Sequence, residues 1–184
     1  MIISTIFQRL KKEQAELDSF IYHQRSIQFE WFSFWNAKRL KLALLTEIAE
    51  FANELRTFKI WSQKELVNLD KAKEELIDCL CFFLGLVNLY NISSLDIINS
   101  VFSFPETEFN DLLLDFFTKT YHLVIIESST LYPYQIKLTP SQLTTYQEWW
   151  KVFQHCCQKL KIESETELFS IYLNKKKVNL ERKK

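Results

Sequence analysis

LVNLDKAKEELIDCLCFFLGLVNLY, residues 66–90, contains the longest apolar run of the chain. From Leu76 to Tyr90 only Asp78 and Asn88 interrupt that run. It is shorter than the roughly 20 residues that a membrane-spanning helix needs, so we predict a buried core helix and no membrane span. One glycine and three prolines in 184 residues leave few turn signals for hairpins, which favours long helices over a sheet.

Helical patterns continue on both sides of this run. Apolar residues recur at intervals of three and four, and helix-start signals include Ser93 with Asp96, Thr139 with Pro140, and Ser164 with Glu167. We predict further helices over residues 2–25, 38–56, 108–126 and 140–162, with a short helix after Ser93 and a last helix after Ser164. The expected fold is an all-α helical bundle that forms a single domain over residues 1–184.

Composition excludes several function classes. With 23 basic and 23 acidic residues the formal net charge is zero, so no overall field attracts nucleic acid or an anionic membrane. The only glycine, Gly85, rules out glycine-rich phosphate loops. Any bound phosphates must therefore be held by a metal ion and side chains. The four cysteines lack CxxC spacing, so we expect neither zinc nor disulfides. The charges at Arg9, Lys11 and Lys12 follow the first short apolar run, on the wrong side for a signal peptide, so we expect a cytoplasmic location.

Two acidic pairs carry the chemical signal of the sequence. Glu47 and Glu50, and then Glu75 and Asp78, are three residues apart, which puts each pair on one face of a helix. Their apolar neighbours should be buried, and a carboxylate at the edge of a core needs a cation. One such pair alone is commonly a solvated helix face that pairs with lysines. Both together, the second opening an apolar helix, predict a site between two central helices for Mg²⁺, or Mn²⁺.

The two pairs resemble the metal-binding signature of the all-α nucleotide pyrophosphohydrolases, a superfamily of dimeric dUTPases, MazG-like enzymes and dCTP pyrophosphatases. Three other segments are similar to the dimeric dUTPase branch: Gln14-x-x-x-Asp18, Glu54-Leu-Arg-Thr-Phe-Lys-Ile-Trp61 and Tyr172-x-x-Lys175-x-x-x-Asn179-x-x-Arg182. The resemblance implies a homodimer that hydrolyses dUTP, or dUDP, with Mg²⁺. From dUTP the products would be dUMP and pyrophosphate, formed by a water that the metal and Glu47 activate.

The resemblance also implies roles for the substrate-binding residues. Trp61 and Phe82 would stack on the base, while Gln14 and Asn179 would read the uracil edge, with Asp18 in the same set. Lys59, Lys175 and Arg182 would neutralise the phosphates. Taken alone, Trp61 is equally expected in a core, and Lys175 with Arg182 equally in a solvated basic C-terminus.

Two other functions remain open from the sequence. The same metal site would serve a dCTPase or a broad-specificity, MazG-like housekeeping pyrophosphohydrolase. A catalytically inactive helical interaction module, with the acidic pairs as surface charges, is the alternative outside the enzyme class.

Overall fold

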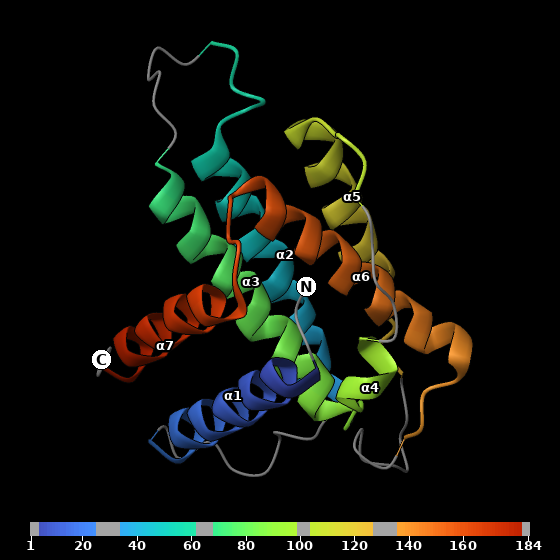
Figure 1. Ribbon diagram of the computed structural model, residues 1–184. Coiled ribbons are helices and arrows are strands. Elements are labelled where there is room, and N and C mark those ends of the chain that lie inside the picture. The colour runs from blue at the N-terminus through green and yellow to red at the C-terminus, as the bar shows by residue number, and fades with distance from the viewer. Residues whose placement is uncertain (1–3, 25–33, 62–67, 99–103, 127–135, 182–184) are drawn as a thin grey trace.

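The computed structural model describes residues 4–24, 34–61, 68–98, 104–126 and 136–181 (Figure 1). Over these ranges the chain is helical and contains no strand, so the predicted all-α fold is confirmed. The helices are α1 (Ser4–Gln24), α2 (Phe34–Leu55), α3 (Leu69–Leu89), α4 (Ser94–Ile97), α5 (Phe109–His122), α6 (Pro140–Lys159) and α7 (Glu165–Glu181).

Helix α3 occupies the centre of the bundle. It packs along α2 and also contacts α1, α6 and α7. In Figure 1, α1 and α7 lie side by side at the lower left of the α2–α3 pair, while α5 and α6 lie on the right. The two helices that carry the acidic pairs are therefore neighbours, and the helices that carry the N- and C-terminal motifs lie against the same part of the bundle.

Aromatic stacking joins the helices of the core. The Phe83 ring of α3 stacks on Trp149 of α6, with centroids 3.9 Å apart and planes 9° from parallel. The Phe7 ring of α1 and the Trp150 ring of α6 are nearly perpendicular, with centroids 4.8 Å apart. The Trp149 indole N–H donates to Thr120 Oγ1 at 2.8 Å, which satisfies its buried polar atom. These contacts connect α1 and α5 to α6, and α6 to α3.

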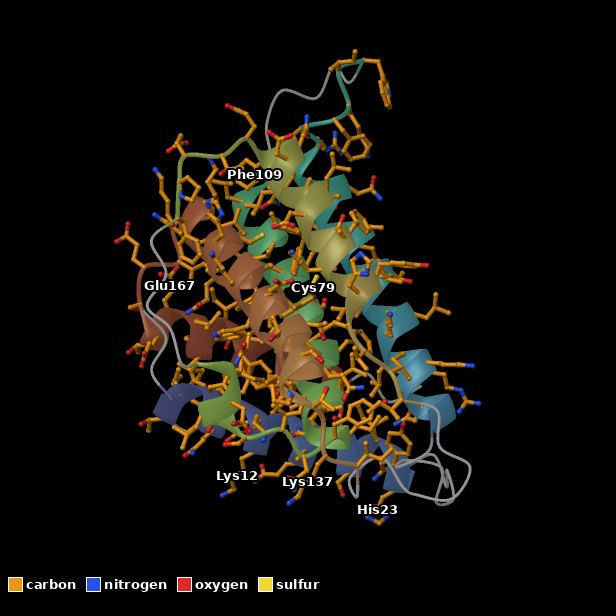
Figure 2. All side chains as sticks on the ribbon, turned by 90° about the vertical axis from the view of Figure 1, so that its right-hand side faces the viewer. Lys12, His23, Cys79, Phe109, Lys137 and Glu167 are labelled. Atoms are coloured by element: carbon orange, nitrogen blue, oxygen red, sulfur yellow. The ribbon has the colours of Figure 1, made fainter. Side chains whose placement is uncertain are left out.

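All four cysteines are buried and free, and Cys79 lies in the middle of the molecule in Figure 2. Burial raises the pKa of each thiol, so the cysteines behave as small core residues. No helix in the described ranges has both the length and the hydropathy to cross a membrane. The single domain and the cytoplasmic location stay predictions.

Helix boundaries follow the predicted caps more closely than the predicted lengths. Helix α6 begins after a capping box in which Thr139 and Gln142 bond each other's backbone N–H groups. Ser164 accepts from the Glu167 N–H at the start of α7. By contrast, the helix predicted after Ser93 is the four-residue α4, and α5 ends at His122 rather than at residue 126. Helix α2 begins at Phe34, four residues earlier than predicted.

Candidate active site

A cavity of about 380 Å³ lies among α1, α2, α3 and α7. Most of the residues predicted for a site line it, together with apolar side chains of α1, α2 and α3. The lining residues are Gln14, Leu17, Asp18, Ile21, Leu40, Glu47, Glu50, Glu75, Asp78, Cys81, Phe82, Lys175 and Asn179. The structure thus brings together one residue or more from each predicted functional segment except the α2–α3 connector.

Three carboxylates converge at one end of the cavity. Oxygen atoms of Glu47 on α2 and of Glu75 and Asp78 on α3 all lie within 4.8 Å of one another. The fully buried Ile48 and Ile77 anchor the two helices next to these carboxylates. Glu50 is more exposed and lines the same cavity, outside this group of three.

Burial and the convergence of like charges raise the pKa of two of these carboxylates, Glu47 and Glu75. The pKa of Glu47 is raised to about 7, first by burial and then by the charges of Asp78, Glu50 and Glu75. Burial and the neighbouring carboxylates also raise the pKa of Glu75. The ammonium of Lys175, only 10% exposed, forms an ion pair with Asp78 and acts against both shifts. One lysine does not fully offset the negative charge of the cluster.

This donor set fits a divalent cation. Carboxylate oxygens are the hard ligands that Mg²⁺ and Mn²⁺ prefer, and here they come from two helices held by the same core. Burial first, and then the negative charge of the neighbouring carboxylates, raises the pKa of Glu47 and of Glu75, and a bound cation would compensate that negative charge. Glu47, Glu75 and Asp78 could therefore hold a metal ion, with Glu50 close enough to line the same cavity.

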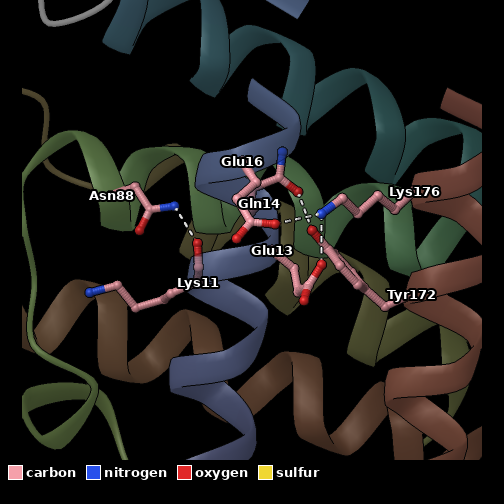
Figure 3. A network of polar contacts seen from close by, with 7 residues as sticks. All are labelled: Lys11, Glu13, Gln14, Glu16, Asn88, Tyr172 and Lys176. Atoms are coloured by element: carbon pink, nitrogen blue, oxygen red, sulfur yellow. Dashed lines mark hydrogen bonds and ion pairs between the residues drawn. The ribbon is translucent and has the colours of Figure 1, made fainter. Parts of the chain in front are cut away.

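Gln14 lines the cavity and connects α1 to α7. Its side chain is 4% exposed, its Nε2 donates to Asp18 Oδ1 at 2.6 Å, and its Oε1 accepts from the Tyr172 hydroxyl at 2.9 Å. Figure 3 shows Gln14 on α1 and Tyr172 on α7 pointing toward one another. Burial raises the pKa of Asp18 to about 7, and the hydrogen bond from Gln14 lowers it.

Gly85 explains how α2 and α3 come so close beside this cavity. A Cβ atom at Gly85 would lie 3.2 Å from Leu40 Cδ2 and 3.8 Å from Asp18 Oδ2. The missing side chain therefore leaves room for Leu40 of α2 against α3, whereas 3.8 Å to Asp18 of α1 is an ordinary contact distance. We used Gly85 only to exclude phosphate loops, although an isolated glycine in an apolar helix is itself a signal of close packing. Tyr172 was noted only as part of a motif.

Two predicted substrate-binding residues, Trp61 and Lys59, lie away from the cavity. Trp61 is 72% exposed at the end of the described part of the connector, 6.4 Å from the Phe58 ring. The Lys59 ammonium lies 5.5 Å from the Phe58 ring centroid. Neither Trp61 nor Lys59 is among the described residues that line the cavity. Arg182 lies outside the described residues. Their roles in substrate binding stay predictions.

Comparison with protein families identifies the family of the chain. Residues 6–184 match the family described as dUTPase. The chain belongs to the dUTPase family. This dUTPase is accordingly a hydrolase of nucleotide metabolism that acts on dUTP, which confirms the predicted family and the predicted dUTP diphosphatase activity. Members of the family generally depend on divalent metals, in keeping with the acidic cluster. Comparisons with curated proteins and with solved structures found no match.

Proposed function

We propose that this dUTPase hydrolyses dUTP to dUMP and pyrophosphate with Mg²⁺ held by Glu47, Glu50, Glu75 and Asp78. The convergence of Glu47, Glu75 and Asp78 oxygens within 4.8 Å is the observation that carries the proposal. Carboxylates that only face solvent would be fully exposed, whereas Glu47, Glu75 and Asp78 are partly buried between two core helices, where negative charge is costly without a cation. When bound, the cation would supply Lewis-acid polarisation of the phosphate oxygens and of the attacking water.

Glu47 is the general base of this proposal. Glu47 is the carboxylate of the cluster that lies on α2, and one of its oxygens lies within 4.8 Å of the oxygens of Glu75 and Asp78. A water on a cation held by these carboxylates would therefore lie within reach of Glu47, which is the geometry that a general base needs. Glu47 would orient the water and take its proton during attack on phosphorus.

Helix α7 supplies the positive side of the site. The ammonium of Lys175 already lies against the acidic cluster through its ion pair with Asp78. A triphosphate bound in the cavity would bring its negative oxygens into the reach of this ammonium, and the Asn179 amide lines the same cavity. Lys175 would neutralise phosphate charge, with Arg182 and Lys59 as further phosphate ligands.

The apolar part of the cavity suits a pyrimidine base. Phe82 lines it together with Leu17 and Leu40, and an aromatic face stacks on any base. Stacking does not distinguish bases, so the amides of Gln14 and Asn179 would supply the selective hydrogen bonds. The uracil ring would lie between these amides and Phe82, with the phosphates toward the carboxylates.

A panel of nucleotides tests this function. The purified chain is assayed with dUTP, dCTP and dTTP, each with Mg²⁺, with Mn²⁺ and after chelation, and both products are quantified. We expect dUMP and pyrophosphate in equal amounts from dUTP, slower turnover of dCTP and dTTP, and none after chelation. Equal turnover of the three nucleotides would instead assign a broad-specificity pyrophosphohydrolase. Absence of turnover at every metal concentration would assign an inactive helical module. Assay of dUDP shows whether it is also a substrate.

We further propose that the chain forms a homodimer. Large apolar side chains are exposed at Ile60 and Trp61 on the connector, and at Leu42 and Leu114 on α2 and α5. Exposed apolar groups of this size are typical of interaction surfaces. In a dimer, Trp61 of one subunit would be able to reach the base-binding part of the cavity in the other subunit. Sedimentation of monomer alone at micromolar concentration would contradict the dimer.

A further inference from the structure

The Gln14 amide is held at both ends. Tyr172 donates to its oxygen and the Asp18 carboxyl accepts from its nitrogen. Because Tyr172 is fully buried, and burial together with the surrounding acidic groups raises its pKa, its hydroxyl keeps its proton and stays a donor. An amide has two N–H groups and two lone pairs on oxygen, so one of each remains for a ligand in the cavity.

A flip of this amide, a half-turn that exchanges the positions of its oxygen and nitrogen, is unfavourable. Gln14 Oε1 would then face an oxygen of Asp18, acceptor against acceptor. The Tyr172 O–H would lose its acceptor at a buried position, which costs more than an exposed hydrogen bond is worth. Glutamine amides in open sites turn over freely and can pair with either arrangement of donor and acceptor. Gln14 is restricted to one of these two arrangements.

We propose that Tyr172 and Asp18 are positioning residues that fix the Gln14 amide in the orientation that pairs with uracil and rejects cytosine. This inference rests on the proposed function, since it concerns the base of the same nucleotide. It gives Asp18 a task other than direct contact with the substrate, and it gives Tyr172 a role in specificity.

The two pyrimidines differ at the atoms that an amide reads. Uracil offers a donor at N3 next to an acceptor at O4, whereas cytosine offers an acceptor at N3 next to a donor at N4. With the base held by its sugar and phosphates, an amide that pairs with one must turn over to pair with the other. A fixed amide therefore leaves unpaired buried groups opposite the wrong base, the strongest source of discrimination between similar substrates.

The test compares two buried tyrosines that each donate one hydrogen bond. Tyr172→Phe removes the donor to Gln14, while the control Tyr146→Phe removes a donor to the Val124 carbonyl, 3.0 Å away on the α5–α6 side of the core. Asp18→Asn is a second variant, because an asparagine amide can donate to a turned-over Gln14. Ratios of kcat/KM for dUTP over dCTP are measured at pH 8, where Asp18 is ionised in the wild type.

We expect Tyr172→Phe to lower the dUTP:dCTP ratio by about three- to tenfold, mainly through KM, as the loss of one neutral hydrogen bond predicts. Asp18→Asn should lower it by about tenfold or more and raise kcat/KM for dCTP, while Tyr146→Phe leaves the ratio unchanged. Binding of dUMP and dCMP, measured by calorimetry, should show the same loss of preference. If the wild type prefers dUTP and both site variants keep its ratio, the inference fails although the proposed function stands. Equal use of dUTP and dCTP by the wild type would reject the proposed specificity itself.

Discussion

Helices α3 and α7 both supply side chains to the cavity, but they are attached to the protein in different ways. Over its second half α3 is buried on nearly every side, and Phe83 and Leu84 are fully enclosed. Helix α7 buries only Leu168 and Tyr172. Phe169 and Ile171 pack against the core while only partly buried. Several further attachments are polar: the Tyr172 bond to Gln14, the Lys175 pair with Asp78, and the Lys176 pairs with Glu13 and Glu16 on α1.

This difference separates two requirements of the site. Metal ligands must keep a fixed separation, and the apolar packing of α2 and α3 provides it regardless of what the cavity holds. Groups that bind phosphate must respond to a ligand, and α7 is held by charged contacts whose strength depends on the ions nearby. The closely packed helices α2 and α3 carry the carboxylates, and α7, which is held partly by charged contacts, carries Lys175 and Asn179.

The largest expected effect comes from the removal of core packing on α3. Phe83→Ala removes the ring that stacks on Trp149 and should lower the free energy of unfolding by about 3–5 kcal/mol. On α7 the control Val178→Ala, at a 44% exposed side chain, should cost roughly 0.5 kcal/mol or less. Urea titration followed by circular dichroism measures both. Similar losses for the two variants would show that α7 is packed as firmly as α3.

The second effect concerns chemistry on α3. Glu75→Gln should lower Mg²⁺-dependent kcat/KM by about 100-fold or more, because it removes a charged oxygen from the cluster without changing its shape. The neighbouring Glu74 is exposed and lies outside the cavity, so Glu74→Gln is the matched control and should keep full activity. Helical content should be unchanged in both. Full activity in Glu75→Gln would remove this residue from the metal site.

A third effect depends on pH. The pKa of Asp18 is raised to about 7 in the folded protein, above its ordinary value, so the folded state binds this proton more tightly. The free energy of unfolding therefore falls as the pH rises from about 4 to about 7 and stays reduced above it. The effect of Asp18→Asn on stability should be more favourable at pH 8 than at pH 4 by roughly 1–3 kcal/mol, because the variant lacks this titration while the cost of its new amide N–H groups is the same at both pH values. Equal effects at the two pH values, measured by urea titration, would contradict the buried carboxyl.

The smallest effect sharpens the description of α7. Lys176 lies 2.6 Å from Glu13 Oε2 and 3.3 Å from Glu16 Oε2, so Lys176→Gln should cost about 0.2–1 kcal/mol, and less at high salt. Amide hydrogen exchange should become faster in α7 and stay unchanged in α3. The exposed neighbour Lys177 provides the control, Lys177→Gln. Faster exchange in both variants would mean that the ion pairs with α1 do not hold the helix.

Local patterns in the sequence predicted the elements and half of the site. The apolar run gave α3, the spacing of acidic residues gave the pairs that face each other, and the capping residues gave the starts of α6 and α7. These signals lie within a few residues of one another, where helix geometry is fixed.

What the sequence left out depends on contacts between distant residues. Helix α5 ends at His122, where the Lys41 ammonium of α2 donates to the carbonyls of Tyr121 and Leu123 at 2.5 Å and 2.9 Å. The Tyr172 bond to Gln14 spans 158 positions, and neither residue carries a local sign of the other. Trp61 and Lys59 were predicted by resemblance alone, and the described cavity does not include them.

Gly85 gives the cavity a property that the carboxylates do not share. A methyl group there would lie 3.2 Å from Leu40 Cδ2, so the Leu40 side chain, which lines the cavity, would have to shift. The three atoms nearest to that methyl group belong to Leu40 and Asp18, and none belongs to Glu47, Glu75 or Asp78. A single carbon on α3 would therefore act on the apolar lining of the cavity and leave the acidic cluster in place, so the choice of nucleotide and the chemistry of hydrolysis can diverge separately in evolution.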